Sequence, residues 1–181
     1  ETNLSKSLTF KKEITELNIF NFLINRTKFK NLINYSSSKY KMVNEDIVVN
    51  DQYIASIESK FNDKIVFKNS INFLKSNIKN SSDQLRKRPE YKLLSSVAYN
   101  DKGNTFYFGL KSVGKSFDSS IPTGNDNLDS YEIFDMFYKK QLTKKNYFKI
   151  SIDNVLDKDY QKSIGFNDNG RNINISFTGN F

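Results

Sequence analysis

In residues 171–181, at the end of the chain, side chains alternate between a polar and an apolar set from Asn172 onwards. Successive side chains of a β-strand point to opposite faces of a sheet, so this pattern predicts a strand with one apolar face and one polar face. The apolar face carries Ile173, Ile175, Phe177, Gly179 and Phe181, and the polar face carries Asn172, Asn174, Ser176, Thr178 and Asn180.

The same two-residue period recurs along the rest of the chain, and no helical periodicity competes with it. Nine strands are expected, at 4–11, 15–26, 49–61, 64–77, 90–100, 104–117, 128–140, 145–155 and 171–181. No segment reaches the roughly 20 apolar residues of a membrane helix. The predicted fold is therefore all-β, and alternation by itself also fits a soluble sheet with one face on a core.

The connections between the expected strands alternate in length. Short connections are expected at 12–14, 62–63, 101–103 and 141–144, and long ones at 27–48, 78–89, 118–127 and 156–170. Outer-membrane β-barrels have short periplasmic turns and longer extracellular loops. The strict alternation of short and long connections therefore favours an antiparallel transmembrane β-barrel meander over a soluble sandwich.

The expected strands are also long, since several exceed the roughly 9–11 residues with which a tilted strand crosses a membrane. Tyr91 and Tyr99 share a face, and a tilted strand separates them in height by roughly 19 Å. That spacing suits two aromatic girdles at opposite membrane interfaces.

Composition narrows the functional classes. Apolar residues make up 37% of the chain and the net charge is +8, which would permit disorder, but Phe 16 and Tyr 10 argue for a folded chain. The chain has no Cys and no His, which removes the thiolate and the imidazole from any proposed catalytic or metal site. We predict no enzyme activity, no cofactor and no metal site, and interpret the pairs Asp126/Asp129 and Asp157/Asp159 as turn-forming residues.

The strand count leads to an expectation about the ends of the chain. If the long loops lie outside the cell, the last strand ends on the periplasmic side and Glu1 lies on the outer side. Complete bacterial barrels have an even number of strands, so nine strands are expected to form an incomplete barrel that lacks its beginning.

The C-terminal third resembles a known family. The segment 150–160, ISIDNVLDKDY, is followed by Gly170-Arg171 and by an alternating strand that ends at Phe181. This order resembles the last two strands of TonB-dependent outer-membrane receptors, most closely their vitamin-B12 and siderophore branch. Looser similarities lie upstream, at Arg88-Pro89, at Ile19-Phe20-Asn21 followed by Asn31-Leu32-Ile33, and at Glu1-Thr2 with Ser5-Lys6-Ser7.

The resemblance implies that residues 1–181 are the C-terminal part of a receptor barrel of about 22 strands. It implies a Gram-negative outer membrane and active uptake of a scarce nutrient such as cobalamin or an iron-siderophore. The implied partners are the TonB complex, the barrel-assembly machinery, outer-membrane lipid and lipopolysaccharide, and the small-molecule nutrient. The N-terminal plug of the family, through which TonB acts, is not visible in this sequence.

Two sets of candidate site residues follow. The resemblance assigns the barrel-assembly signal to Phe181, Phe177, Ile175 and Ile173. Contacts with the nutrient are expected in the long outer loops, where aromatic rings can stack on a ligand and guanidinium groups can bind an anionic one. The candidates are Tyr35, Tyr40, Arg86, Arg88, Tyr160 and Phe166, with Lys87 beside the two arginines.

Two alternatives remain open at this stage. The chain could be a self-contained small porin-like barrel, against which the odd strand count argues. It could also be a soluble basic β-sheet module that binds single-stranded nucleic acid, because lysines and aromatic residues are interspersed. Against this, the lysines are spread over turns and loops and no ribonucleoprotein-type aromatic motif is present, so we expect no nucleic-acid partner.

Overall fold

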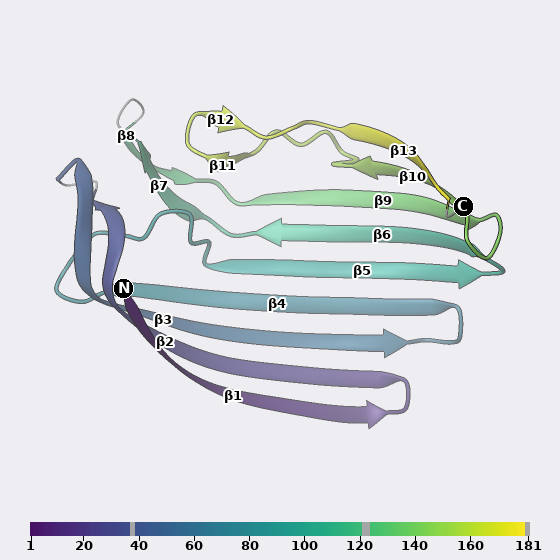
Figure 1. Ribbon diagram of the computed structural model, residues 1–181, viewed down its shortest axis with the longest axis horizontal. Helices are drawn as coiled ribbons and strands as arrows, with labels where there is room; N and C mark the ends of the chain where they lie inside the picture. Colours follow the sequence, from purple (N-terminus) through teal and green to yellow (C-terminus); the bar gives the residue numbers. More distant parts are fainter. Residues whose placement is uncertain (37–38, 121–123, 180–181) are drawn as a thin grey trace.

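The computed structural model describes residues 1–36, 39–120 and 124–179 and shows an all-β fold (Figure 1). Nine strands pair in sequence order into one antiparallel meander, in which the two small hairpins β7–β8 and β11–β12 lie outside the main sheet. The main strands are β1 (Thr2–Thr15), β2 (Asn18–Ser36), β3 (Lys41–Lys60), β4 (Ile65–Ile78), β5 (Tyr91–Asp101), β6 (Asn104–Val113), β9 (Tyr131–Gln141), β10 (Tyr147–Asp153) and β13 (Asn172–Thr178).

This meander confirms the predicted fold class and the predicted number of strands. β1 and β13 form the two edges, and within the described residues they pair with β2 and β10 but not with each other. No helix in the described part of the chain is long and apolar enough to cross a membrane.

Rows of apolar side chains run across the sheet on one face. One row joins Tyr99, Phe106, Tyr138, Ile150 and Ile175, which are register partners on five neighbouring strands. A second row on the same face runs from Phe10 on β1 through Phe22, Ala55 and Ile71 to Leu93 on β5.

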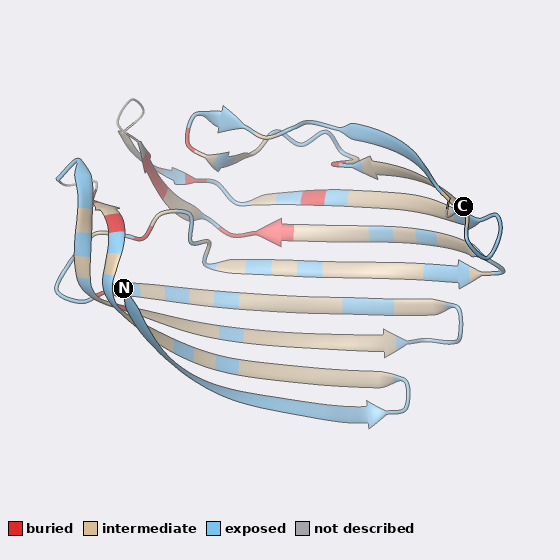
Figure 2. Cartoon of the chain, viewed as in Figure 1, coloured by how far each residue is buried: buried red, intermediate tan, exposed pale blue. Residues whose placement is uncertain are grey.

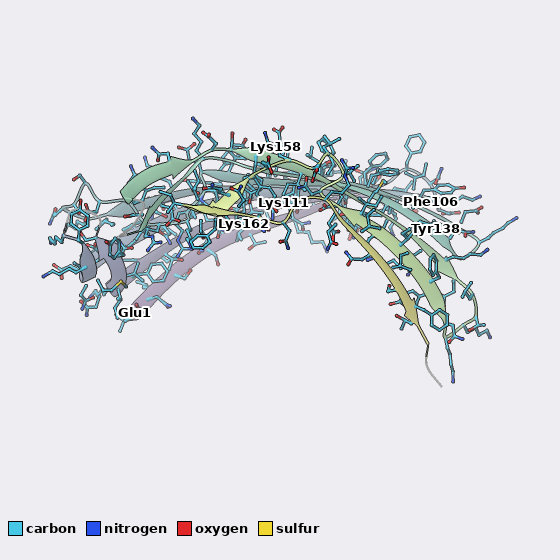
Figure 3. All side chains as sticks on the ribbon, turned by 90° about the horizontal axis from the view of Figure 1, so that it is seen from above. Glu1, Phe106, Lys111, Tyr138, Lys158 and Lys162 are labelled. Carbon is cyan, nitrogen blue, oxygen red and sulfur yellow. The ribbon has the colours of Figure 1, made fainter. Side chains whose placement is uncertain are left out.

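The opposite face is mostly polar. One of its rows joins Lys11, Asn21, Ser56, Ser70, Leu94 and Lys111 across six strands. On this face Lys68 donates to Glu58 at 2.9 Å, and a hollow of about 530 Å³ extends over strands β2 to β9. Seen from above, the sheet is an arch: Phe106 and Tyr138 lie along its outer flank and Lys111 lies beneath it (Figure 3). We call the apolar side the convex face and the polar side the concave face.

The chain reverses through tight turns at one end of the strands, the turn end, and through longer connections at the other, the loop end (Figure 1). The predicted turns at 62–63, 101–103 and 141–144 fall at the observed reversals within a residue or two. The turn predicted at 12–14 is wrong, because β1 continues to Thr15 and the chain reverses at Glu16-Leu17. The hydroxyl of Thr15 accepts hydrogen bonds from Leu17 N at 3.2 Å and from Asn18 Nδ2 at 2.7 Å, which places the turn there.

The long connections are more ordered than the sequence suggests. Most of the loop predicted at 27–48 is a continuation of β2 and β3, which stay in register from Asn18↔Ser59 to Ser36↔Lys41. This β2–β3 hairpin bends away from the sheet beyond Lys30, where Asn31 has a positive φ of 58° (Figure 1). Within 118–127 and 156–170 the chain forms the hairpins β7 (Ser116–Ser120) with β8 (Gly124–Leu128), and β11 (Gln161–Ser163) with β12 (Phe166–Asn167).

Burial is concentrated at the loop end. Strand residues over most of the sheet are intermediate or exposed, and the buried ones gather near the long connections (Figure 2). The apolar cluster there consists of Val48, Ile78 and Leu85, packed against Phe29 and Leu32. A sheet with most apolar side chains exposed on one face needs an apolar surrounding on that face.

Candidate functional site

Three loop-end segments meet at the carboxylate of Asp118, a side chain with no exposed surface. Asp118 Oδ1 accepts a hydrogen bond from Arg86 Nε at 2.7 Å, across 32 residues of sequence. The same carboxylate accepts from the backbone N–H of Ile164 at 2.9 Å and of Ser119 at 2.9 Å. One buried acid therefore joins the 79–90 connection, the β7–β8 hairpin and the β11–β12 hairpin.

The hydrogen bonds to Asp118 decide its protonation. Burial alone would raise the pKa of this carboxyl, but the bonds donated by Ile164, Arg86 and Ser119 outweigh burial and hold the pKa below its ordinary value. Asp118 is thus a carboxylate at neutral pH, paired with the Arg86 guanidinium.

Tyr35 and Arg86, two of the predicted ligand contacts, lie together. The Arg86 guanidinium carbon lies 5.5 Å from the centre of the Tyr35 ring, a cation–π distance. The Tyr35 hydroxyl is buried and finds no hydrogen-bond partner among the described residues. Arg86 is already neutralised by Asp118, so its contact with an anionic nutrient stays a prediction, and so does the contact of Tyr35.

The other four predicted contacts are dispersed. The Tyr160 ring packs 4.4 Å from that of Tyr131, with Lys162 Nζ 5.3 Å from its centre. Tyr40 lies at the β2–β3 turn and Phe166 in β12, with 68% and 73% of their surface exposed. Arg88 is exposed and lines a different cavity from Tyr160. These four residues remain predicted contacts, and they do not form one pocket.

The segment 150–160, which resembles the receptor family, has a structural role at the loop end. The Asn154 side chain accepts from Lys158 N at 2.9 Å and donates to Lys158 O at 3.0 Å, which closes a turn. Asp157 Oδ1 then accepts from Arg171 N at 2.7 Å. A Cβ on Gly170 would lie 2.8 Å from that same Asp157 oxygen, so any other residue here would require the Asp157 side chain to shift. Asp157 therefore acts as a turn residue, as the sequence predicts. Of the other aspartates predicted to form turns, Asp159 is exposed, and the side chain of Asp126 lies outside the described residues.

The residues assigned to barrel assembly lie on the edge strand. Ile173, Ile175 and Phe177 are register partners of Ile152, Ile150 and Phe148, which places them on the convex face. They are 59%, 68% and 60% exposed. Phe181 lies outside the described residues, and the assembly role of all four stays a prediction.

One cavity beneath the loops is lined by Lys87, which the sequence places beside the candidate arginines, and by three lysines that sequence reasoning missed, Lys92, Lys111 and Lys162. The four lysines are spread over 76 residues of sequence, so only the alternation that puts Lys92 and Lys111 on the polar face pointed towards them. Within the described residues, no group of three or more acidic side chains is arranged to hold a metal ion.

Comparison with known proteins identifies the fold. No protein-family model matches the chain, and no curated protein sequence matches it. Among solved structures it is similar to the ferric-catecholate import receptor Fiu of Escherichia coli K12, with a TM-score of 0.77 and 15% identity over 99% of this chain and 27% of that one.

Two Pseudomonas aeruginosa receptors are similar in the same way. The ferric enterobactin receptor PfeA gives a TM-score of 0.78 at 16% identity, over 99% of this chain and 31% of that one. The ferripyoverdine receptor of the outer membrane gives 0.73 at 17% identity, over 99% and 27%. The chain thus spans between about a quarter and a third of the length of these proteins, and its fold is that of a section of the β-barrel of TonB-dependent siderophore receptors.

Proposed function

We propose that residues 1–181 form a section of an outer-membrane receptor barrel, the C-terminal one, that takes part in TonB-dependent uptake of an iron-siderophore or a similar scarce nutrient such as cobalamin. The observation that carries this proposal is the alignment of 99% of the chain with the ferric-siderophore receptors above. Those neighbours are receptors for import, and none of them is an enzyme.

The two faces of the sheet support a place in the outer membrane of a Gram-negative bacterium. The convex face carries apolar rows that need lipid, and it carries aromatic pairs near both ends of the strands. Tyr99 and Phe106 lie 6.3 Å apart near the turn end, and Phe73 and Tyr91 lie 6.3 Å apart nearer the loop end. Aromatic residues mark both interfaces of outer-membrane barrels.

The proposed partners follow from this placement. The loop end would face the medium and meet the nutrient, while the convex face would contact lipid and lipopolysaccharide. Ile173, Ile175, Phe177 and Phe181 would be read by the barrel-assembly machinery. The TonB complex would act through a plug domain inside the barrel, next to the concave face.

An uptake experiment tests the proposal. The gene is deleted from the host bacterium, and accumulation of a radiolabelled panel of iron-siderophores and of cobalamin is followed before and after complementation with the whole gene. We expect accumulation of one panel member to fall to background in the deletion strain and to return with the gene. We also expect it to need TonB and an energised inner membrane.

The controls separate this function from the porin alternative. A porin passes small solutes without TonB, so uptake that persists in a TonB-deleted strain would contradict the proposal. Unchanged accumulation of every panel member in the deletion strain would contradict it as well, provided that the protein is detected in outer membranes of the parent strain.

A further inference from the structure

Four lysines line one cavity of about 230 Å³ where the concave face meets the loops. Lys92 and Lys111 come from β5 and β6, Lys87 from the 79–90 connection, and Lys162 from β11. Lys111 pairs with Leu94 and Lys92 with Val113, so the two lysines are diagonal neighbours on adjacent strands. Side chains of this length reach one another across such a diagonal. Lys111 and Lys162 lie near each other beneath the arch, while Lys158 lies on the other side (Figure 3).

Three of these four lysines form no ion pair within the described residues, although the Asp135 carboxylate acts electrostatically on Lys111. Lys162 forms an ion pair with Asp168. Lys87 Nζ donates to the hydroxyl of Ser163 at 2.5 Å, which supplies no negative charge. Lys92 and Lys111 form no hydrogen bond or ion pair within the described parts of the chain, although Lys111 is half-buried. Asp129 also lines the cavity, but its side chain is 93% exposed and lies 4.0 Å from Lys115.

We propose that this cavity, the lysine pocket, binds a soluble multivalent oxyanion, a molecule that presents at least two negatively charged oxygens. The ammonium groups of Lys92 and Lys162 act unfavourably on that of Lys111, as like charges near one another do. Charged oxygens placed among Lys87, Lys92 and Lys111 would replace that repulsion with charge-assisted hydrogen bonds. Val113, Leu128 and the ring of Tyr131 supply the apolar remainder of the lining and suit an organic body on the anion.

The position of the lysine pocket favours a soluble ligand over a lipid headgroup. Lys92 and Lys111 lie on the concave face, opposite the apolar convex face that we assign to lipid. The pocket also lies at the loop end, through which a nutrient would enter. The inference thus rests on the proposed function for the direction of access, and it deepens that function by naming the chemical class of the ligand.

The test is lysine footprinting on the whole protein in outer-membrane vesicles, with pyrophosphate and citrate as probes. An amine-acetylating reagent is applied, and the modification of each lysine is quantified by mass spectrometry. We expect both probes to slow the acetylation of Lys92 and Lys111 by about tenfold, the effect of a charge-assisted hydrogen bond. Lys158, and acetate or chloride at equal ionic strength, are expected to give no protection. Equal slowing at every lysine, or none at Lys92 and Lys111, would overturn the proposal.

Variants give a second readout. Pyrophosphate should also protect Lys87 in the wild-type protein; Lys92→Gln with Lys111→Gln should abolish that protection, and Lys158→Gln should leave it intact. The wild-type footprint decides the matter even if the double variant does not assemble. Footprinting needs no transport, so protection without nutrient uptake would refute the receptor function alone, and uptake without protection would refute the pocket alone.

Discussion

Arg86 and Asp118, which are 32 residues apart in the sequence, form a hydrogen-bonded ion pair at 2.7 Å in which the carboxylate is entirely buried and the arginine side chain is 30% exposed. The pair joins two connections that the sheet itself does not link. Because Asp118 also accepts from Ile164 N, a third segment depends on it. The loop end is therefore organised by one carboxylate, which links three segments of the chain: the 79–90 connection, the β7–β8 hairpin and the β11–β12 hairpin.

Asp118→Asn should loosen the loop end. The substitution keeps the size of the side chain but leaves the Arg86 guanidinium without its counter-charge. We expect this to cost about 1.5–3 kcal/mol of local stability, the range for a hydrogen bond to a charged group. Protease nicking of the folded protein between 79 and 90 and between 114 and 130 measures this opening. Asp129→Asn is the matched control, because that carboxylate is exposed and should change nothing. Equal rates of protease nicking in the two variants would contradict the role of Asp118 in organising the loop end.

The same carboxylate predicts a pH dependence. Its pKa in the folded protein is lower than the ordinary value of 3.8, so the stability that it contributes is fully present above that value. This contribution should be lost only as the pH falls below about 3.8, through the lower folded-state pKa. Pepsin cleavage of the loops across this range tests the prediction. The Asp118→Asn variant should lack this transition, and a transition near neutral pH would show that another group is responsible.

Two neighbouring residues on β4 should lose unequal amounts of stability when each is replaced by lysine. Ile71 lies in an apolar row on the convex face, between Ala55 and Leu93, while Ser70 lies on the concave face between Ser56 and Leu94. Lysine on the lipid face of a barrel costs about 2–4 kcal/mol near the bilayer centre, whereas lysine in a polar lumen is tolerated. Urea-induced unfolding in lipid vesicles should therefore show a large loss for Ile71→Lys and little for Ser70→Lys. The reverse order would mean that the faces are assigned wrongly.

The β5–β6 turn should depend on Gly103 and not on Lys102. Both residues have positive φ, 79° and 44°, as a two-residue hairpin turn between Asp101 and Asn104 requires. Gly103→Ala would force a side chain into this conformation and place its Cβ 3.1 Å from the Cβ of Gln141, which should cost about 1–2 kcal/mol. Lys102→Gly removes strain at a similar position and should not destabilise the protein. The urea midpoints of the two variants decide the matter.

The sequence by itself determined the sheet. Phe106, Phe108 and Leu110 point to one face of the sheet, and the residues between them point to the other. In the proposed membrane setting one face meets lipid and the other a polar interior, and that constraint is local and repeats every two residues. The number of strands, their faces and the separation into a turn end and a loop end follow from it. The turn role of Asp157 could also be predicted, since its partners lie within fourteen residues.

Only the tertiary structure decided the loop end. The β2–β3 hairpin between Lys30 and Lys41 bends away from the main sheet, so the apolar face of the sheet imposes no alternation there and the sequence looks like a loop. The turn at Glu16-Leu17 depends on the bonds of one hydroxyl, that of Thr15, which the alternation of β1 does not reveal. The ion pair of Arg86 with Asp118 joins residues that are far apart in the sequence. The same holds for the cavity lined by Lys87, Lys92, Lys111 and Lys162. Such arrangements exist only after the sheet has brought its connections together.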